Sequence, residues 1–128
     1  MSTILVLTSS ALGTASVSNQ LAQDAIARLH LQDPDRRIIT RDLGGNPIPH
    51  LTVESATALR GAEPGNAEQT AARALSDELI AEIKAADTLV IGAGRATLYG
   101  LATAGGAGVD HVLRLLKNEV DRALAQIG

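Results

Sequence analysis

Three short apolar runs alternate along the chain with longer stretches in which apolar residues recur every three or four positions. The runs are rich in Ile, Leu and Val, as buried parallel strands are, and they lie at residues 3–8, 38–42 and 88–92. The longer stretches have the spacing of helices with one buried face, and they lie at residues 18–31, 67–86 and 109–127. This order predicts an α/β fold with a short parallel sheet between helical layers and right-handed crossovers.

The connecting segments carry turn residues. Asp33-Pro34-Asp35 ends the first predicted helix, which begins at about Asn19. Residues 44–49 predict an extended loop, residues 53–59 a weak helix and residues 61–66 a flexible connection. Glycines at residues 105–108 predict a break before the last helix. We expect all 128 residues to form a single domain.

Composition narrows the function classes. The net charge of −3 argues against a nucleic-acid surface, which would need a basic stripe. Cysteine is absent, and His30, His50 and His111 are not spaced as metal ligands, so we expect no metal site. No apolar run approaches the length of a membrane span, and we expect a soluble, cytoplasmic protein. Tyr99 is the one aromatic residue, which leaves little surface on which an isoalloxazine ring could stack.

Two segments could hold an anion. Hydroxyl residues crowd the loop between the first strand and the first helix, and a helix N-terminus with short donors suits a phosphate. The same residues could equally act as helix caps and turns. The third strand runs into Gly94 and Arg95, where a glycine permits close approach and an arginine adds a charged fork. The alternative for this pair is a glycine turn with a solvated arginine.

Five sequence segments in the first part of the chain occur together and in order. They are ILVLTSS at residues 4–10, SVSNQL at 16–21, RDL at 41–43, NPIP at 46–49 and ALSDELIAEIKAAD at 74–87. With these segments, residues 1–93 resemble the FMN-dependent NADH-azoreductase and quinone reductase family. The resemblance implies a flavodoxin-like fold with strand order 2-1-3. It also implies that Ser9, Ser16, Ser18 and the N–H of Val17 hold the FMN phosphate.

The resemblance stops after the third strand. The family continues there with a Pro-Met-Tyr-Asn segment that wraps the flavin ring, whereas this chain has Gly94-Arg95-Ala96-Thr97, and two further strands of the fold do not follow. The remainder contains GRATLYGLA at residues 94–102, GGAGV at 105–109 and VLRLLKNEVDR at 112–122. Residues 94–128 thereby resemble the last βα unit of FMN-dependent 2-hydroxy-acid dehydrogenases, which are TIM barrels. That resemblance implies that Gly94 and Arg95 belong to an FMN phosphate site.

A junction between two such segments has two explanations, a natural fusion or an engineered chimera, and we expect the second. Because the ring-wrapping segment is absent, we expect a scaffold that holds FMN, phosphate or sulfate without robust catalysis. The alternative is an FMN-dependent NADH:quinone or azo oxidoreductase. A short sheet with unpaired edges and an apolar helical stripe at residues 109–127 also predicts a homodimer, formed through the third strand or through packed helices.

Overall fold

The chain forms two compact units, Met1–Ile91 and Gly92–Gly128, in a computed structural model that describes residues 2–61, 63–92 and 95–127. The division lies close to residue 93, where the sequence changes from one resemblance to the other.

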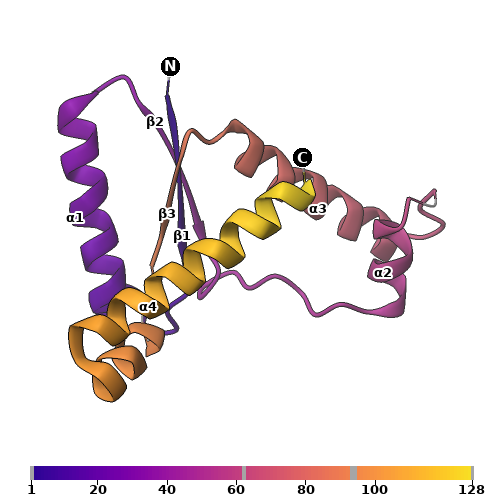
Figure 1. The fold of residues 1–128 in the computed structure, drawn as a ribbon. Coiled ribbons are helices and arrows are strands. Elements are labelled where there is room, and N and C mark those ends of the chain that lie inside the picture. Colours follow the sequence, from indigo (N-terminus) through magenta and orange to yellow (C-terminus); the bar gives the residue numbers. More distant parts are fainter. Residues whose placement is uncertain (1, 62, 93–94, 128) are drawn as a thin grey trace. The chain divides into compact units, whose positions relative to one another are not determined.

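The first unit is built on a three-stranded parallel sheet. Its strands are β1 (Thr3–Thr8), β2 (Arg37–Asp42) and β3 (Thr88–Ile91), in the order β2-β1-β3 (Figure 1). Ile4 lies opposite Ile38 on one side and Thr88 on the other. The predicted strand order and parallel direction are therefore confirmed. β3 ends at Ile91, one residue before the predicted end at Gly92.

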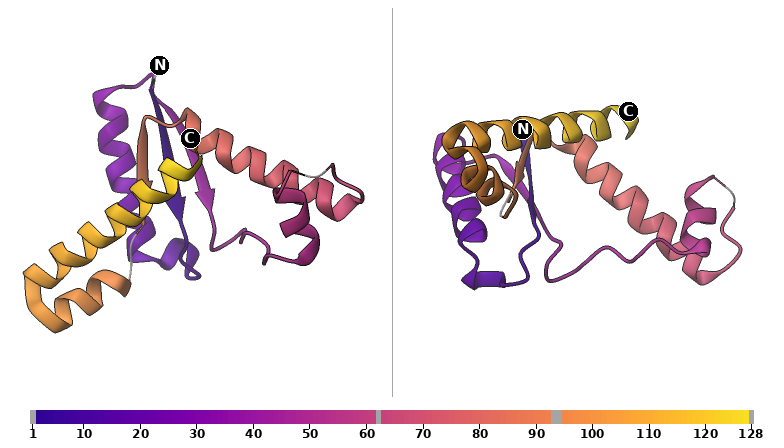
Figure 2. Two further views of the ribbon diagram at one scale, coloured as in Figure 1. Left: turned by 45° about the vertical axis from the view of Figure 1, so that its right-hand side comes forward. Right: turned by 60° about the horizontal axis from the view of Figure 1, so that its bottom comes forward.

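Helices lie on both sides of this sheet. α1 (Val17–Gln32) lies along one face and α3 (Ala67–Ala85) approaches the other, as the views in Figures 1 and 2 agree. α2 (Val53–Leu59) packs against α3 at the end remote from the sheet. The weak helix predicted at residues 53–59 is confirmed. The result is the α/β arrangement that the alternating pattern predicts.

The core lies between β1 and α1. Ile4 and Val6 point to the same face, since side chains alternate along a strand, and they pack against Ala22 and Ile26. Leu5 points to the opposite face and is also fully buried. The central strand is thus buried on both faces, as its uninterrupted apolar sequence predicts.

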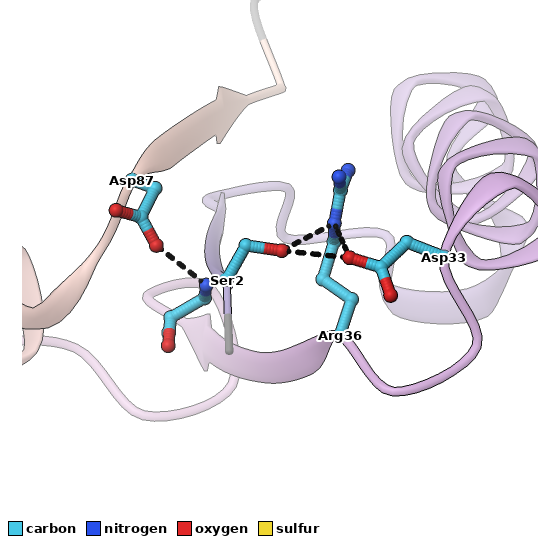
Figure 3. Close-up of polar contacts among 5 residues, drawn as sticks. Ser2, Asp33, Arg36 and Asp87 are labelled. Atoms are coloured by element: carbon cyan, nitrogen blue, oxygen red, sulfur yellow. Dashed lines mark hydrogen bonds and ion pairs between the residues drawn. The ribbon is translucent and has the colours of Figure 1, made fainter.

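Polar side chains join neighbouring elements of the first unit at both ends of the strands. At the amino ends, the Ser2 hydroxyl donates to the Asp33 carboxylate at 2.9 Å and accepts from Nε of Arg36 at 2.9 Å (Figure 3). The Ser2 hydroxyl, chiefly, and Arg36 hold the pKa of Asp33 below its usual value. Beside them the backbone N–H of Thr3 donates to Asp87 at 2.8 Å, which ties the start of β1 to the start of β3.

Toward the other end, β2 is held to α3 by charge. Nη2 of Arg41 lies 2.6 Å from Glu82 and 2.6 Å from Glu78, and Nε donates to Glu82 at 3.1 Å. The Arg41 side chain is 14% exposed, whereas that of Glu78 is 57% exposed. The hydrogen bonds that Arg41 donates to Glu82, chiefly, and to Glu78 raise the pKa of Arg41 further above its ordinary value. The pair with Glu82 is the more enclosed of the two, so it contributes more to docking α3.

The second unit contains one long helical segment, α4 (Arg95–Ile127), with an internal kink. Ala104 and Gly105 leave helical geometry, and Gly105 takes a φ of +57°. The predicted break at residues 105–108 is therefore correct in kind but begins one residue earlier, and Gly106 and Gly108 are helical. A Cβ on Gly108 would lie 1.9 Å from the Gly100 carbonyl oxygen, so the two helical segments meet backbone to backbone. Of the helices in the described ranges, none is long and apolar enough to cross a membrane.

Candidate anion-binding site

The loop after β1 leads into α1 through a tight turn. A short 3₁₀ helix, η1 (Gly13–Ala15), precedes Ser16, and Gly13 adopts a φ of +52°, which a glycine tolerates best. The backbone N–H of Ser16 donates to the Gly13 carbonyl at 3.1 Å. This turn aims the first residues of α1 at the carboxyl end of the sheet, where ligands of open α/β sheets bind.

Ser16 caps α1. Its hydroxyl oxygen accepts from the N–H of Asn19 at 3.4 Å, and it lies 2.9 Å from the hydroxyl of Ser18. Ser16 is 4% exposed, whereas Ser18 is partly exposed. α1 therefore begins at Val17, two residues before the predicted start at Asn19, because the cap is Ser16.

Two backbone donors remain at this terminus. The N–H groups of Val17 and Ser18 have no hydrogen-bond partner among the described residues, as expected for the first turn of a helix. The positive end of the helix dipole lies at the same place. The first turn carries no acidic residue. Free amides, a hydroxyl and the dipole together make this terminus suited to an anion.

The loop after β2 packs against the loop after β1. The Thr8 hydroxyl donates to Asp42 at 3.3 Å, and the N–H of Leu43 donates to the Thr8 carbonyl at 2.7 Å. A Cβ on Gly44 would lie 2.3 Å from the backbone oxygen of Ser10, so the two loops are in close backbone contact. These contacts hold the loop after β1, which carries the hydroxyl residues, against the loop after β2.

A groove of about 530 Å³ lies next to this terminus, between α1 and the ends of β1 and β2. Asp24 and Asp42 contribute carboxylates to its lining, and no basic residue is among the described residues that line it. Ser9, Ser16, Val17 and Ser18 do not line it. Gly13 and Asn19, beside the start of α1, also line it, but its two carboxylates disfavour a phosphate within the groove itself.

The structure brings together part of the predicted site. Ser16, Val17 and Ser18 are adjacent at the start of α1. Ser9 follows β1 directly and is exposed, with no hydrogen bond to the other three. Gly94 lies outside the described residues. α4 begins at Arg95, but the Arg95 side chain is likewise outside the described part of the chain, so convergence of the two loops stays a prediction.

Sequence reasoning missed the contribution of Asn19. Its side-chain amide donates from Nδ2 to the Gly13 carbonyl at 3.0 Å, while its Oδ1 is buried without a partner. The Ser-x-Ser-Asn spacing contains this residue, but its acceptor is a backbone carbonyl, which has no signature in the sequence. For metals, no group of three or more His, Cys, Asp or Glu in residues 2–61, 63–92 and 95–127 is arranged to hold an ion.

Comparison with known proteins follows the same division of the chain. A family model described as flavodoxin-like fold matches residues 2–94, which is well over half of the chain. The chain belongs to the flavodoxin-like fold family. A second model, described as FMN-dependent dehydrogenase, matches residues 85–128 and overlaps the first by ten residues, 85–94.

Relatives of this flavodoxin-like chain carry a shared name. An FMN-dependent NADH:quinone oxidoreductase of Hyphomonas neptunium is 50% identical over 93 residues, which cover 73% of this chain and 44% of the relative. A protein of the same name from Marinomonas sp. is 38% identical over 115 residues, covering 89% of this chain and 58% of the relative. The second alignment is too long to stop at residue 94, so it includes part of the second unit. The chain spans about half the length of these relatives.

Among solved structures, the azoreductase from Bacillus anthracis str. Sterne superposes with a TM-score of 0.58 and 21% identity. That superposition covers 72% of this chain and 46% of the azoreductase. It supports the flavodoxin-like fold of this chain.

Proposed function

We propose that the N-terminus of α1 binds the phosphate of FMN, and that this chain serves an FMN-dependent NADH:quinone oxidoreductase activity. Ser16, Ser18 and the N–H groups of Val17 and Ser18 form the center of the site, with Ser9 beside them. The observation that carries the proposal is the pair of free amides at a serine-capped helix start.

The donors of this terminus fit a phosphate. A phosphate group offers acceptor oxygens and negative charge, and this helix start offers N–H and O–H donors. The Ser16 hydroxyl can accept from Asn19 N–H and still direct its own proton toward Ser18, since a hydroxyl has one donor and two acceptor positions. Ser18 is thereby oriented at the edge of the site, where it can donate to a phosphate oxygen.

Bound FMN would supply the redox chemistry, taking a hydride from NADH and passing electrons to a quinone. The chain's own residues would bind and orient the cofactor. The N-terminus of α1 would hold the phosphate, and the loop after β2 supports the loop after β1 through the backbone contact at Gly44.

From the sequence we expect a scaffold without robust catalysis. The names of the relatives favour the alternative, an oxidoreductase. Because this chain spans about half of those relatives, the activity of the whole protein is carried over as a proposal. The match of residues 85–128 to a second FMN-related family supports a contribution of Gly94 and Arg95 to the phosphate site. A chimeric origin stays a hypothesis, since the Marinomonas alignment also extends into these residues.

A binding titration and a turnover assay test this proposal. We expect FMN fluorescence to change on titration with the protein, and inorganic phosphate to compete. Riboflavin, which lacks the phosphate, should bind far more weakly. NADH-dependent reduction of a quinone should require added FMN. Equal affinity for FMN and riboflavin would contradict the phosphate site. Binding of FMN without any turnover would contradict the oxidoreductase activity and favour a scaffold.

A further inference from the structure

The side chain of Asn19 connects the two parts of the proposed phosphate site. Its Nδ2 donates to the Gly13 carbonyl at 3.0 Å, and that same carbonyl accepts the N–H of Ser16 at 3.1 Å. Its backbone N–H donates to the Ser16 hydroxyl at 3.4 Å. Asn19 therefore contacts the turn before the helix and the cap of the helix at once.

The remaining atom of this amide is unusual. Oδ1 of Asn19 is buried and has no hydrogen-bond partner among the described residues. A buried acceptor without a donor destabilises a fold, and such groups call for an explanation beyond stability. One N–H of Nδ2 is bonded to the Gly13 carbonyl, so the explanation we favour lies in what that bond holds in place.

We propose that Asn19 is a positioning residue for the anion site. It holds the left-handed turn at Gly13 against the first turn of α1, and it thereby sets the direction of the free Val17 and Ser18 N–H groups. Asn19 itself does not contact the anion. This inference rests on the proposed function for its ligand, but its structural part can be measured without one.

Gln20 provides a matched control. Its side chain also reaches back to the same turn and donates to the Thr14 carbonyl, but at 3.3 Å and in an exposed position. Asn19→Ala and Gln20→Ala thus each remove one side-chain hydrogen bond to neighbouring carbonyls. Losing a hydrogen bond that positions the site should weaken FMN and inorganic phosphate binding by the same factor, about fivefold, in Asn19→Ala. Gln20→Ala should bind both as the unaltered protein does.

A second substitution, in the same turn, tests whether the effect of Asn19→Ala on binding arises from that turn. Gly13→Val introduces a β-branched residue at a φ of +52°, where no atom outside its immediate chain neighbours lies within 4 Å of the added Cβ, so the substitution strains the backbone of the turn and its Cβ meets no clash. We expect Gly13→Val to weaken FMN and phosphate as Asn19→Ala does. The double variant should be no weaker than either single variant, because both changes act through one turn.

Amide hydrogen exchange of Ser16 supplies the readout without ligand. In Asn19→Ala this N–H should exchange faster, while core amides of β1 keep their protection; in Gln20→Ala both should be unchanged. If the unaltered protein binds neither FMN nor phosphate, the proposed function fails, and the Ser16 exchange rate alone decides the positioning role. Unchanged exchange and unchanged affinities in Asn19→Ala would overturn the inference.

Discussion

Replacing Ser16 by alanine and by glycine separates its capping role from its role at the anion site. Ser16 is an N-cap with a near-buried hydroxyl, so Ser16→Ala should lower the free energy of unfolding by about 1 kcal/mol. Ser16→Gly should lower it by only about 0.3 kcal/mol, because glycine is a tolerated N-cap. Both variants lack the hydroxyl that orients Ser18.

FMN affinity should fall in both variants, because both lack the Ser16 hydroxyl, although their stabilities differ. The bond from Ser18 to the charged phosphate contributes about 1.5–3 kcal/mol, and without the Ser16 hydroxyl Ser18 is no longer oriented for it, so both variants should bind FMN about ten- to a hundredfold more weakly. Urea denaturation gives the stabilities, and fluorescence titration gives the affinities. Ser18→Ala, which leaves the cap in place, should lose affinity with stability changed by less than about 0.5 kcal/mol. If Ser16→Gly bound FMN like the unaltered protein, Ser16 would be a cap alone and the reasoning would fail.

Four further predictions concern the rest of the chain. Glu82→Gln should lower the free energy of unfolding by about 1–2 kcal/mol and Glu78→Gln by less than about 0.5 kcal/mol in urea denaturation, because the Glu82 pair is the more enclosed. Gly108→Ala should separate the two segments of α4, whereas Gly106→Ala, with open space around it, should leave them packed; amide exchange over residues 95–127 compares the two. The lowered pKa of Asp33 contributes stability that is present above pH about 4 and is lost as the pH falls through the pKa of the folded state. An NMR titration that found the pKa of Asp33 at or above 3.8 would contradict this prediction. Light scattering at micromolar concentration should give the mass of a homodimer, associated through β3 or packed helices, and a monomer mass would refute this.

The sheet could be predicted from the sequence because its signals are local. The run from Thr3 to Thr8 is apolar without interruption, which marks a strand buried on both faces, and the structure buries Ile4, Leu5 and Val6 completely. The strand order rested on resemblance, since apolar runs alone do not specify which strand is central.

The start of α1 could not be located as well. Ser16, Ser18 and Asn19 are all residues that favour an N-cap, and only the hydrogen bond from the Asn19 N–H to Ser16 distinguishes them. The site has the same limitation. Hydroxyls near a helix start predicted an anion site, but the bond from Asn19 to a backbone carbonyl at Gly13 depends on the folded turn.

The kink in α4 shows how one composition permits several geometries. Any glycine of residues 105–108 could have broken the helix, and Gly105 alone among them takes a positive φ. Gly108 is needed for a different reason, its close approach to the backbone of Gly100. A sequence shows that the chain can bend there, whereas the packing partner decides which residue bends.

The central claim is that the N-terminus of α1 holds the phosphate of FMN. NMR spectra of the ¹⁵N-labelled protein test it most directly, by following the Val17 and Ser18 amide resonances during separate titrations with FMN, inorganic phosphate and riboflavin. Both resonances should shift with FMN and with phosphate and stay in place with riboflavin. Shifts confined to other residues, such as Asp24 and Asp42 in the neighbouring groove, would contradict it.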